Sequence, residues 1–169
     1  MPSRAYDFRP MSAADLPLLG RWLASAQVSE WWGTPAEQFA LISADLAEPS
    51  LAQYIVAVAG RPFGYLQCYD VQAWPGGGLG RQPLGARGID QFIGEADMLD
   101  RGHGSAFIRA FVDRLLAAGC PRVLTDPDPA NARAIRAYRK AGFSADREVT
   151  TPEGRALLLI RDNDRTLPA

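Results

Sequence analysis

The carboxylate of Asp90 occupies a position where an acidic residue is unexpected. It lies within Ile89–Ile93, a stretch that otherwise has the composition of an apolar strand, and strands disfavour aspartate. A structural aspartate there would need compensating partners, whereas an aspartate at a functional site can accept a proton or pair with a cation. The alternative is a solvated position on a strand edge. We favour the functional interpretation, with Asp90 as a catalytic residue.

Two further acids, Asp126 and Asp128, flank Pro127 directly after a predicted strand. Two carboxylates in this position can face a cleft, but Asp and Pro are also favoured in turns. For Asp128 we favour the turn. From its sequence position alone, Asp126 is compatible with either role.

A glycine-rich segment, Leu99–Ser105, predicts an anion-binding loop. Gly102 and Gly104 let the backbone approach a bulky anion with its N–H groups turned outward, and the following helix adds about half a positive charge at its N-terminus. Arg101 adds a full charge. The segment is not a P-loop, because no Gly-Lys-Ser/Thr follows, and it lacks the third glycine of a dinucleotide fingerprint. The alternative is a plain turn before a helix.

The single histidine and the two cysteines restrict the possible chemistry. One histidine nearly excludes a Ser-His-Asp triad or a His-rich zinc site, and we expect no metal. Cys68 and Cys120 lie among apolar residues without a nearby histidine, so we expect buried, inert thiols rather than a covalent acyl-enzyme. His103 lies within the glycine-rich segment, where we expect it to contact phosphate and not to act as the base.

The elements that must position these residues alternate between strands and helices. Apolar spacing predicts a helix from Leu16 that ends before Trp31, a weaker one over 35–46, and clear ones over 105–118 and 132–141. Strands are expected at 5–9, 54–59, 63–71, 88–94, 122–125, 143–149 and 155–160. The glycine-rich stretch 73–87 is expected to be a loop. This order predicts an α/β fold with a mixed central β-sheet flanked by α-helices.

Composition indicates one globular domain over residues 1–169, with 47% hydrophobic and 22% charged residues. The net charge of −1 provides no basic field for nucleic acid or anionic lipid. No apolar run approaches the roughly 20 residues of a membrane helix, and the first residues lack a signal-peptide core. Two thiols fit a reducing compartment. We therefore expect a cytoplasmic monomer or homodimer that binds neither nucleic acid nor membrane.

The segment Asn131–Phe143 resembles the second cofactor motif of the GCN5-related N-acetyltransferases, the GNAT superfamily. The glycine-rich segment about thirty residues earlier occupies the place of that superfamily's pyrophosphate loop, although Leu99 stands where Gln or Arg is usual. The resemblance implies a GNAT fold and acetyl-CoA as co-substrate. Tyr138 would reach the cofactor sulfur and protonate the leaving thiolate, and Asn131 would both cap its helix and contact the cofactor arm. The cofactor-binding residues would be Phe92, Ile93, Asp100, Arg101, Gly102, His103, Gly104, Ser105, Asn131, Ala134 and Tyr138.

Four shorter segments look like the aminoglycoside 6′-N-acetyltransferases within this superfamily: Glu30–Gly33, Arg87–Gln91, Thr125–Pro127 and Val149–Gly154. The family implies direct attack on acetyl-CoA by a primary amine of the antibiotic in a ternary complex. The substrate would lie against Trp31, Trp32, Asp90, Gln91 and Asp126, and Glu30 and Glu95 could line the same pocket.

One of the two tryptophans would form a wall for a sugar ring, or the pair would be a core residue beside a rim residue. The alternatives are acetylation of another small amine or a siderophore hydroxylamine, and a non-catalytic acyl-CoA binding module. Asp90 and Tyr138 argue against the last of these, because binding alone requires neither.

Overall fold

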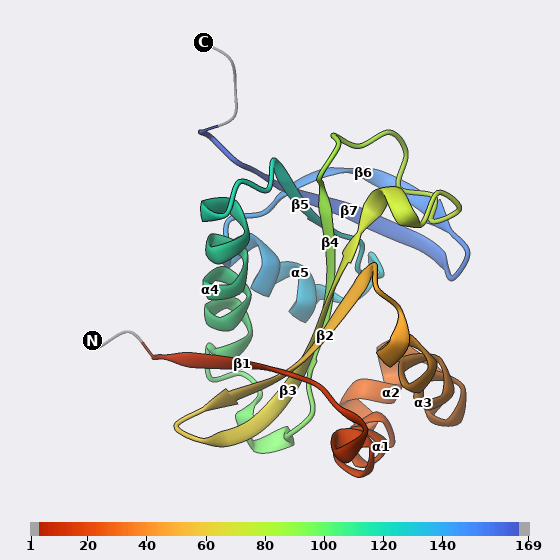
Figure 1. The fold of residues 1–169 in the computed structure, drawn as a ribbon, viewed down its shortest axis with the longest axis vertical. Helices are drawn as coiled ribbons and strands as arrows, with labels where there is room; N and C mark the ends of the chain where they lie inside the picture. The colour runs from red at the N-terminus through yellow and green to blue at the C-terminus, as the bar shows by residue number, and fades with distance from the viewer. Residues whose placement is uncertain (1–3, 166–169) are drawn as a thin grey trace. The chain divides into compact units, whose positions relative to one another are not determined.

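The computed structural model describes residues 4–165, which divide into two compact units. The first unit comprises residues up to Cys68 together with Gln91–Gly104, and the second comprises Tyr69–Asp90 together with the chain from Ser105 onward. Seven strands are hydrogen-bonded in the order β1-β2-β3-β4-β5-β7-β6 (Figure 1). Strands β3 (Arg61–Asp70) and β4 (Arg87–Ile93) each contribute residues to both units. The sheet is mixed, as expected, because β4 and β5 run parallel while other pairs run antiparallel.

The first unit combines the N-terminal strands with three short helices. Strand β1 (Tyr6–Pro10) pairs antiparallel with β2 (Leu51–Val58). A 3₁₀ turn whose Asp15 side chain accepts from the Ser12 backbone N–H leads into the helices. These are α1 (Leu16–Leu23), α2 (Ala26–Trp32) and α3 (Pro35–Ala44).

The single helix predicted between Leu16 and Trp31 is wrong, because α1 ends and α2 begins around Ser25. The backbone of Ser25 is extended, at φ −69° and ψ 145°. Its hydroxyl donates to the carbonyl oxygen of Trp22 at 2.5 Å. A serine that hydrogen-bonds to nearby backbone offers the chain an alternative to continuing the helix. The apolar spacing continues across this break, so periodicity alone could not reveal it.

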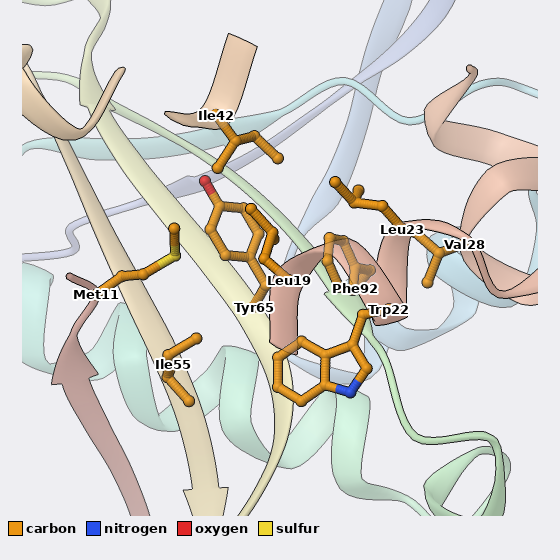
Figure 2. Close-up of a cluster of buried hydrophobic side chains, with 9 residues drawn as sticks. All are labelled: Met11, Leu19, Trp22, Leu23, Val28, Ile42, Ile55, Tyr65 and Phe92. Atoms are coloured by element: carbon orange, nitrogen blue, oxygen red, sulfur yellow. The ribbon is translucent and has the colours of Figure 1, made fainter. Parts of the chain in front are cut away.

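The core of the first unit forms where the helices pack on the strands (Figure 2). Figure 2 shows the rings of Trp22, Tyr65 and Phe92 gathered with aliphatic side chains from the helices and β2. Tyr65 and Phe92 stack with ring centroids 5.3 Å apart. Gly94 is required beside this cluster, because an added Cβ there would lie 2.2 Å from the Trp22 ring. These contacts fix the end of β4 and the chain that leads toward the glycine-rich segment.

The second unit contains the clearest helices and the C-terminal strands. Helix α4 (His103–Ala117) begins in the first unit and continues in the second, followed by β5 (Arg122–Thr125) and α5 (Ala132–Lys140). Strands β6 (Ser144–Thr151) and β7 (Gly154–Asp162) form the long blue hairpin of Figure 1. All these elements were predicted to within two or three residues at their ends.

The glycine-rich stretch before β4 is irregular, as predicted, but it is firmly held. The Gln72 side-chain amide donates to the carbonyl of Pro83 at 2.8 Å, and the Arg147 guanidinium reaches the carbonyl of Leu79 at 3.4 Å. Gly78 has φ +75°, and a Cβ there would lie 2.3 Å from the carbonyl oxygen of Thr150. Only glycine allows this close approach, so the loop packs directly on β6.

Candidate functional site

The glycine-rich segment forms an open turn at the start of α4. Asp100 and Gly102 adopt positive φ values of 55° and 80°, and no atom lies within 4 Å of the place where a Cβ of Gly102 would be. The helix begins at His103, so the first N–H groups of a 15-residue helix lie in this turn. Arg101 is exposed beside them. The turn thus provides the backbone donors, the helix dipole and the positive charge that an anion requires.

The His103 side chain points away from this turn into the core of the first unit. It is 6% exposed, and its Nδ1 is 2.9 Å from the hydroxyl of Tyr6. Burial, followed by the nearby cations Arg4 and Arg101, lowers the pKa of His103, so the ring is neutral at pH 7. The His103 side chain is therefore not placed to make the expected contact to phosphate. The group that His103 leaves available to an anion is its backbone N–H.

The second cofactor motif folds into α5 as the sequence indicated. The Asn131 side-chain oxygen accepts from the Ala134 N–H at 3.2 Å, which confirms its predicted role as helix cap. Tyr138 is buried, with its ring edge-on to Phe143 at a centroid distance of 5.5 Å. Tyr138 therefore packs within the fold, and any role at a cofactor would coexist with this packing.

Three carboxyl groups come together in the second unit: Asp90 on β4, Asp126 directly after β5, and Glu153 in the β6–β7 turn. Burial, then repulsion by Asp90 and by Glu153, raises the pKa of Asp126 to about 8. We call these three residues the carboxyl cluster. Among residues 4–165, no group of three or more acids, histidines and cysteines is placed to hold a metal ion. The cluster is thus an electrostatically strained site that a cation would relieve.

The sheet accounts for the position of the two aspartates. Strands β4 and β5 are parallel, with Gly88 opposite Leu124. Asp90 lies two residues beyond Gly88, and Asp126 lies two residues beyond Leu124, just past the end of β5. The parallel register thus brings the two carboxyl groups close enough to repel one another. The backbone after Asp126 is fixed by a hydrogen bond of 2.8 Å from the Leu157 N–H to the Pro127 carbonyl.

Glu153 enters the cluster through the turn of the hairpin. Its carboxylate accepts from the Thr151 hydroxyl at 3.1 Å, and its own N–H donates to the same hydroxyl at 3.2 Å. Glu153 lies in Val149–Gly154, one of the segments that look like the aminoglycoside acetyltransferases, but no sequence pattern assigned it a role. Asp128, by contrast, accepts from the Ala130 N–H at 2.8 Å and is exposed, which confirms the predicted turn.

The expected acceptor-side residues of the first unit separate into packed and exposed groups. Trp32 packs edge-on against Phe92 at 5.1 Å and against Tyr65, whereas Trp31 is 37% exposed. Trp32 is thus the core-side and Trp31 the rim-side residue. Gln91 and Ile93 are half-buried, and Glu30 is exposed.

Glu95, expected to line an acidic pocket, is compensated by its own neighbours. Its carboxylate accepts from the Trp22 indole N–H and from Arg21, both at 2.8 Å. These bonds, with the Trp22 hydrogen bond contributing most, lower the pKa of Glu95. Glu95 therefore ties α1 to the segment after β4 and leaves little uncompensated charge for a substrate.

The prediction of buried thiols is correct for Cys68 but not for Cys120. Neither is in a disulfide; Cys68 is buried and Cys120 is half-buried. Burial raises the pKa of the Cys120 thiol, although the carbonyl of Arg122 accepts its hydrogen bond at 3.2 Å. A raised pKa disfavours the thiolate that a covalent mechanism would use.

The acetyltransferase (GNAT) domain family matches residues 12–151 of this chain. The chain belongs to the GNAT acetyltransferases. It is therefore an acyltransferase enzyme with the GNAT fold, as the two cofactor segments predicted.

Similar proteins cover nearly the whole chain. An aminoglycoside N(6′)-acetyltransferase type 1 from Klebsiella pneumoniae is 38% identical over 163 residues, which is 90% of this chain and 81% of the relative. The solved structure of AAC(6′)-Ib in complex with paromomycin and acetyl-CoA is 34% identical, with a TM-score of 0.84 over 97% of this chain and 98% of the other. The same enzyme in complex with coenzyme A and kanamycin also gives a TM-score of 0.84 at 34% identity, over 96% and 99% of the two chains. Within residues 4–165, no helix has both the length and the apolar character needed to cross a bilayer.

Proposed function

We propose that this GNAT enzyme transfers an acetyl group from acetyl-CoA to the 6′-amine of an aminoglycoside. The observation that carries this proposal is the carboxyl cluster, in which burial and two neighbouring acids raise the pKa of Asp126 to about 8. A polycationic ligand would bring positive charge to these mutually repelling acids, and the interaction favours ionised carboxylates. The 38% identity to an aminoglycoside N(6′)-acetyltransferase supports the same class of acceptor.

The turn before α4 suits the pyrophosphate of acetyl-CoA. Open space at Gly102 allows the anion to approach the backbone, and the exposed Arg101 provides a cation beside the helix N-terminus. We assign the pyrophosphate to this turn, including Asp100, Gly104 and Ser105. Phe92 and Ile93, which belong to the same unit as the turn, would supply further contacts to the cofactor. Bound acetyl-CoA supplies the activated thioester.

The acceptor amine must lose a proton before or during attack, because at neutral pH a sugar amine is mostly an ammonium ion. Asp90 first pairs with that ammonium and then accepts its proton, leaving a neutral nucleophile. The C–N bond to the acetyl carbon forms as the C–S bond breaks. Tyr138 donates a proton to the departing thiolate and regains one when the acylated nitrogen loses its second proton. The products are an amide and a free thiol, with one proton left on Asp90. Within the second unit, Asp126 and Glu153 hold the rest of the cationic acceptor.

A thiol-release assay with acetyl-CoA and a panel of amines tests the proposed function. We expect kanamycin and tobramycin, which carry a 6′-amine, to release thiol. Paromomycin, with a 6′-hydroxyl, should not, because a hydroxyl offers no cation to Asp90 and is a far weaker neutral nucleophile. Release with other small amines or hydroxylamines alone would reassign the acceptor. Binding of acetyl-CoA without release for any amine would indicate a binding module.

A further inference from the structure

Strand β1 is attached to the turn before α4 at two points. The Tyr6 hydroxyl is 2.9 Å from His103 Nδ1, and the Arg4 guanidinium donates to the backbone carbonyl of Arg101 at 3.0 Å. Each bond joins residues that are 97 positions apart in the sequence. Both ends of each bond lie within the first unit. None of the sequence motifs includes Tyr6 or Arg4, and the chemistry proposed above does not use them.

The Tyr6–His103 contact is buried and tightly packed. Tyr6 is 4% exposed and His103 6% exposed, and Phe63, which is fully buried, contacts both rings. The Tyr6 and His103 rings meet edge-to-face at a centroid distance of 5.9 Å. A buried imidazole nitrogen that loses its hydrogen-bond partner is costly, so this arrangement restricts where the His103 ring can lie.

The position of the His103 ring determines the position of its backbone. His103 is the first residue of α4, and its N–H is one of the donors that the turn offers to an anion. Strand β1 is itself held by pairing with β2 from Tyr6–Val58 to Pro10–Tyr54. The imidazole thus connects a backbone donor to a rigid sheet, which is how supporting residues pre-organise a binding site.

We propose that Tyr6 is a positioning residue for acetyl-CoA, acting through the buried His103 ring to hold the backbone donors of the turn in place. This inference rests on the proposed function, which assigns the pyrophosphate to that turn. The Arg4 bond to Arg101 supports the same turn from the solvent side. Tyr6 itself contacts no substrate.

The variant Tyr6→Phe tests this inference, because it keeps the ring and removes only the hydroxyl. The matched control is Tyr65→Phe, since the Tyr65 hydroxyl also donates a hydrogen bond within the first unit, but to Gln67 at 2.8 Å. Coenzyme A binding is measured by calorimetry, and kcat and KM by thiol release. One net hydrogen bond corresponds to about a threefold to tenfold change in affinity.

We expect Tyr6→Phe to weaken coenzyme A binding about threefold to tenfold, with kcat at saturating acetyl-CoA and KM for kanamycin unchanged. Tyr65→Phe should leave coenzyme A affinity at the wild-type value. Arg4→Met, an exposed substitution, should weaken coenzyme A binding by about twofold. The double variant Tyr6→Phe/His103→Leu should bind coenzyme A more tightly than the fold-changes of the two single variants, multiplied together, would predict. The reason is that it removes both polar groups and leaves neither without a partner.

Two results would overturn the inference while leaving the proposed function intact. One is wild-type coenzyme A affinity in a folded Tyr6→Phe variant, and the other is equal weakening in Tyr65→Phe. Failure of the wild-type protein to bind coenzyme A would instead remove the assignment of the turn, and the role of Tyr6 with it.

Discussion

Replacement of Asp126 by Asn should change how the stability of the protein depends on pH. The folded-state pKa of Asp126 is raised from 3.8 to about 8, chiefly by burial and then by Asp90 and Glu153. An acid with a raised pKa binds its proton more tightly when folded, so stability falls as pH rises from the unfolded value to the folded one. The free-energy cost of ionising Asp126 in the folded protein is fully present above pH 8 and absent below pH 4.

The size of the effect follows from the two pKa values. Each unit of difference corresponds to about 1.4 kcal/mol, so between pH 5 and pH 9 the ionisation of Asp126 lowers the free energy of unfolding by on the order of 4 kcal/mol. This cost belongs to the cluster as a whole, because the three carboxyl groups interact. The amide of Asn cannot ionise, so Asp126→Asn removes the cost while keeping the shape of the side chain.

Urea unfolding at pH 5, 7 and 9, followed by tryptophan fluorescence, measures the effect. The difference in stability between Asp126→Asn and wild type should widen from pH 5 to pH 9 by several kcal/mol, in favour of the variant. Asp128→Asn is the control, because Asp128 is exposed and Asn keeps its turn hydrogen bond to Ala130. If the difference in the free energy of unfolding between Asp126→Asn and wild type stays constant with pH, the pKa of Asp126 is not raised by the carboxyl cluster.

Three further predictions concern activity and binding. Asp90→Asn should lower turnover by about 10²–10⁴-fold, with little change in acetyl-CoA affinity, because the amide cannot accept the proton; near-wild-type rates from pH 6 to 9 would place the base elsewhere. Gly104→Val should abolish coenzyme A binding measured by calorimetry while the circular dichroism spectrum stays unchanged, because a branched side chain blocks the approach of the anion to the backbone. Kanamycin binding at pH 7 should release protons, because a bound cation favours the ionised form of Asp126. The release is measured from the dependence of the binding enthalpy on the ionisation enthalpy of the buffer, and Asp126→Asn should reduce it.

Much of the fold was accessible from the sequence because local signals and tertiary packing agree. Asn131 predicts the start of α5, and its side chain accepts the capping hydrogen bond there. The strand over 122–125 and the C-terminal hairpin follow from short apolar runs bounded by turn residues. The break at Ser25 was not accessible, because the hydroxyl bond to Trp22 competes with the helix without disturbing the apolar spacing.

The candidate site was only partly accessible for a similar reason. Asp90 stands out because an acid in an apolar strand is unusual, whereas Glu153 lies in a turn, where acids are common. Its membership of the carboxyl cluster depends on the β5–β7 pairing, which brings the C-terminal hairpin beside the end of β5. The burial of His103 was hidden in the same way, because its partner Tyr6 lies at the other end of the first unit's sequence.

The mass of kanamycin after incubation with the pure protein and acetyl-CoA shows directly whether the protein acetylates an aminoglycoside. We expect kanamycin to gain one acetyl group, located on the 6′-nitrogen by fragmentation, and paromomycin to gain none under the same conditions. An unchanged mass of kanamycin, with a protein that is folded and binds coenzyme A, would contradict the assignment of the carboxyl cluster as an aminoglycoside site.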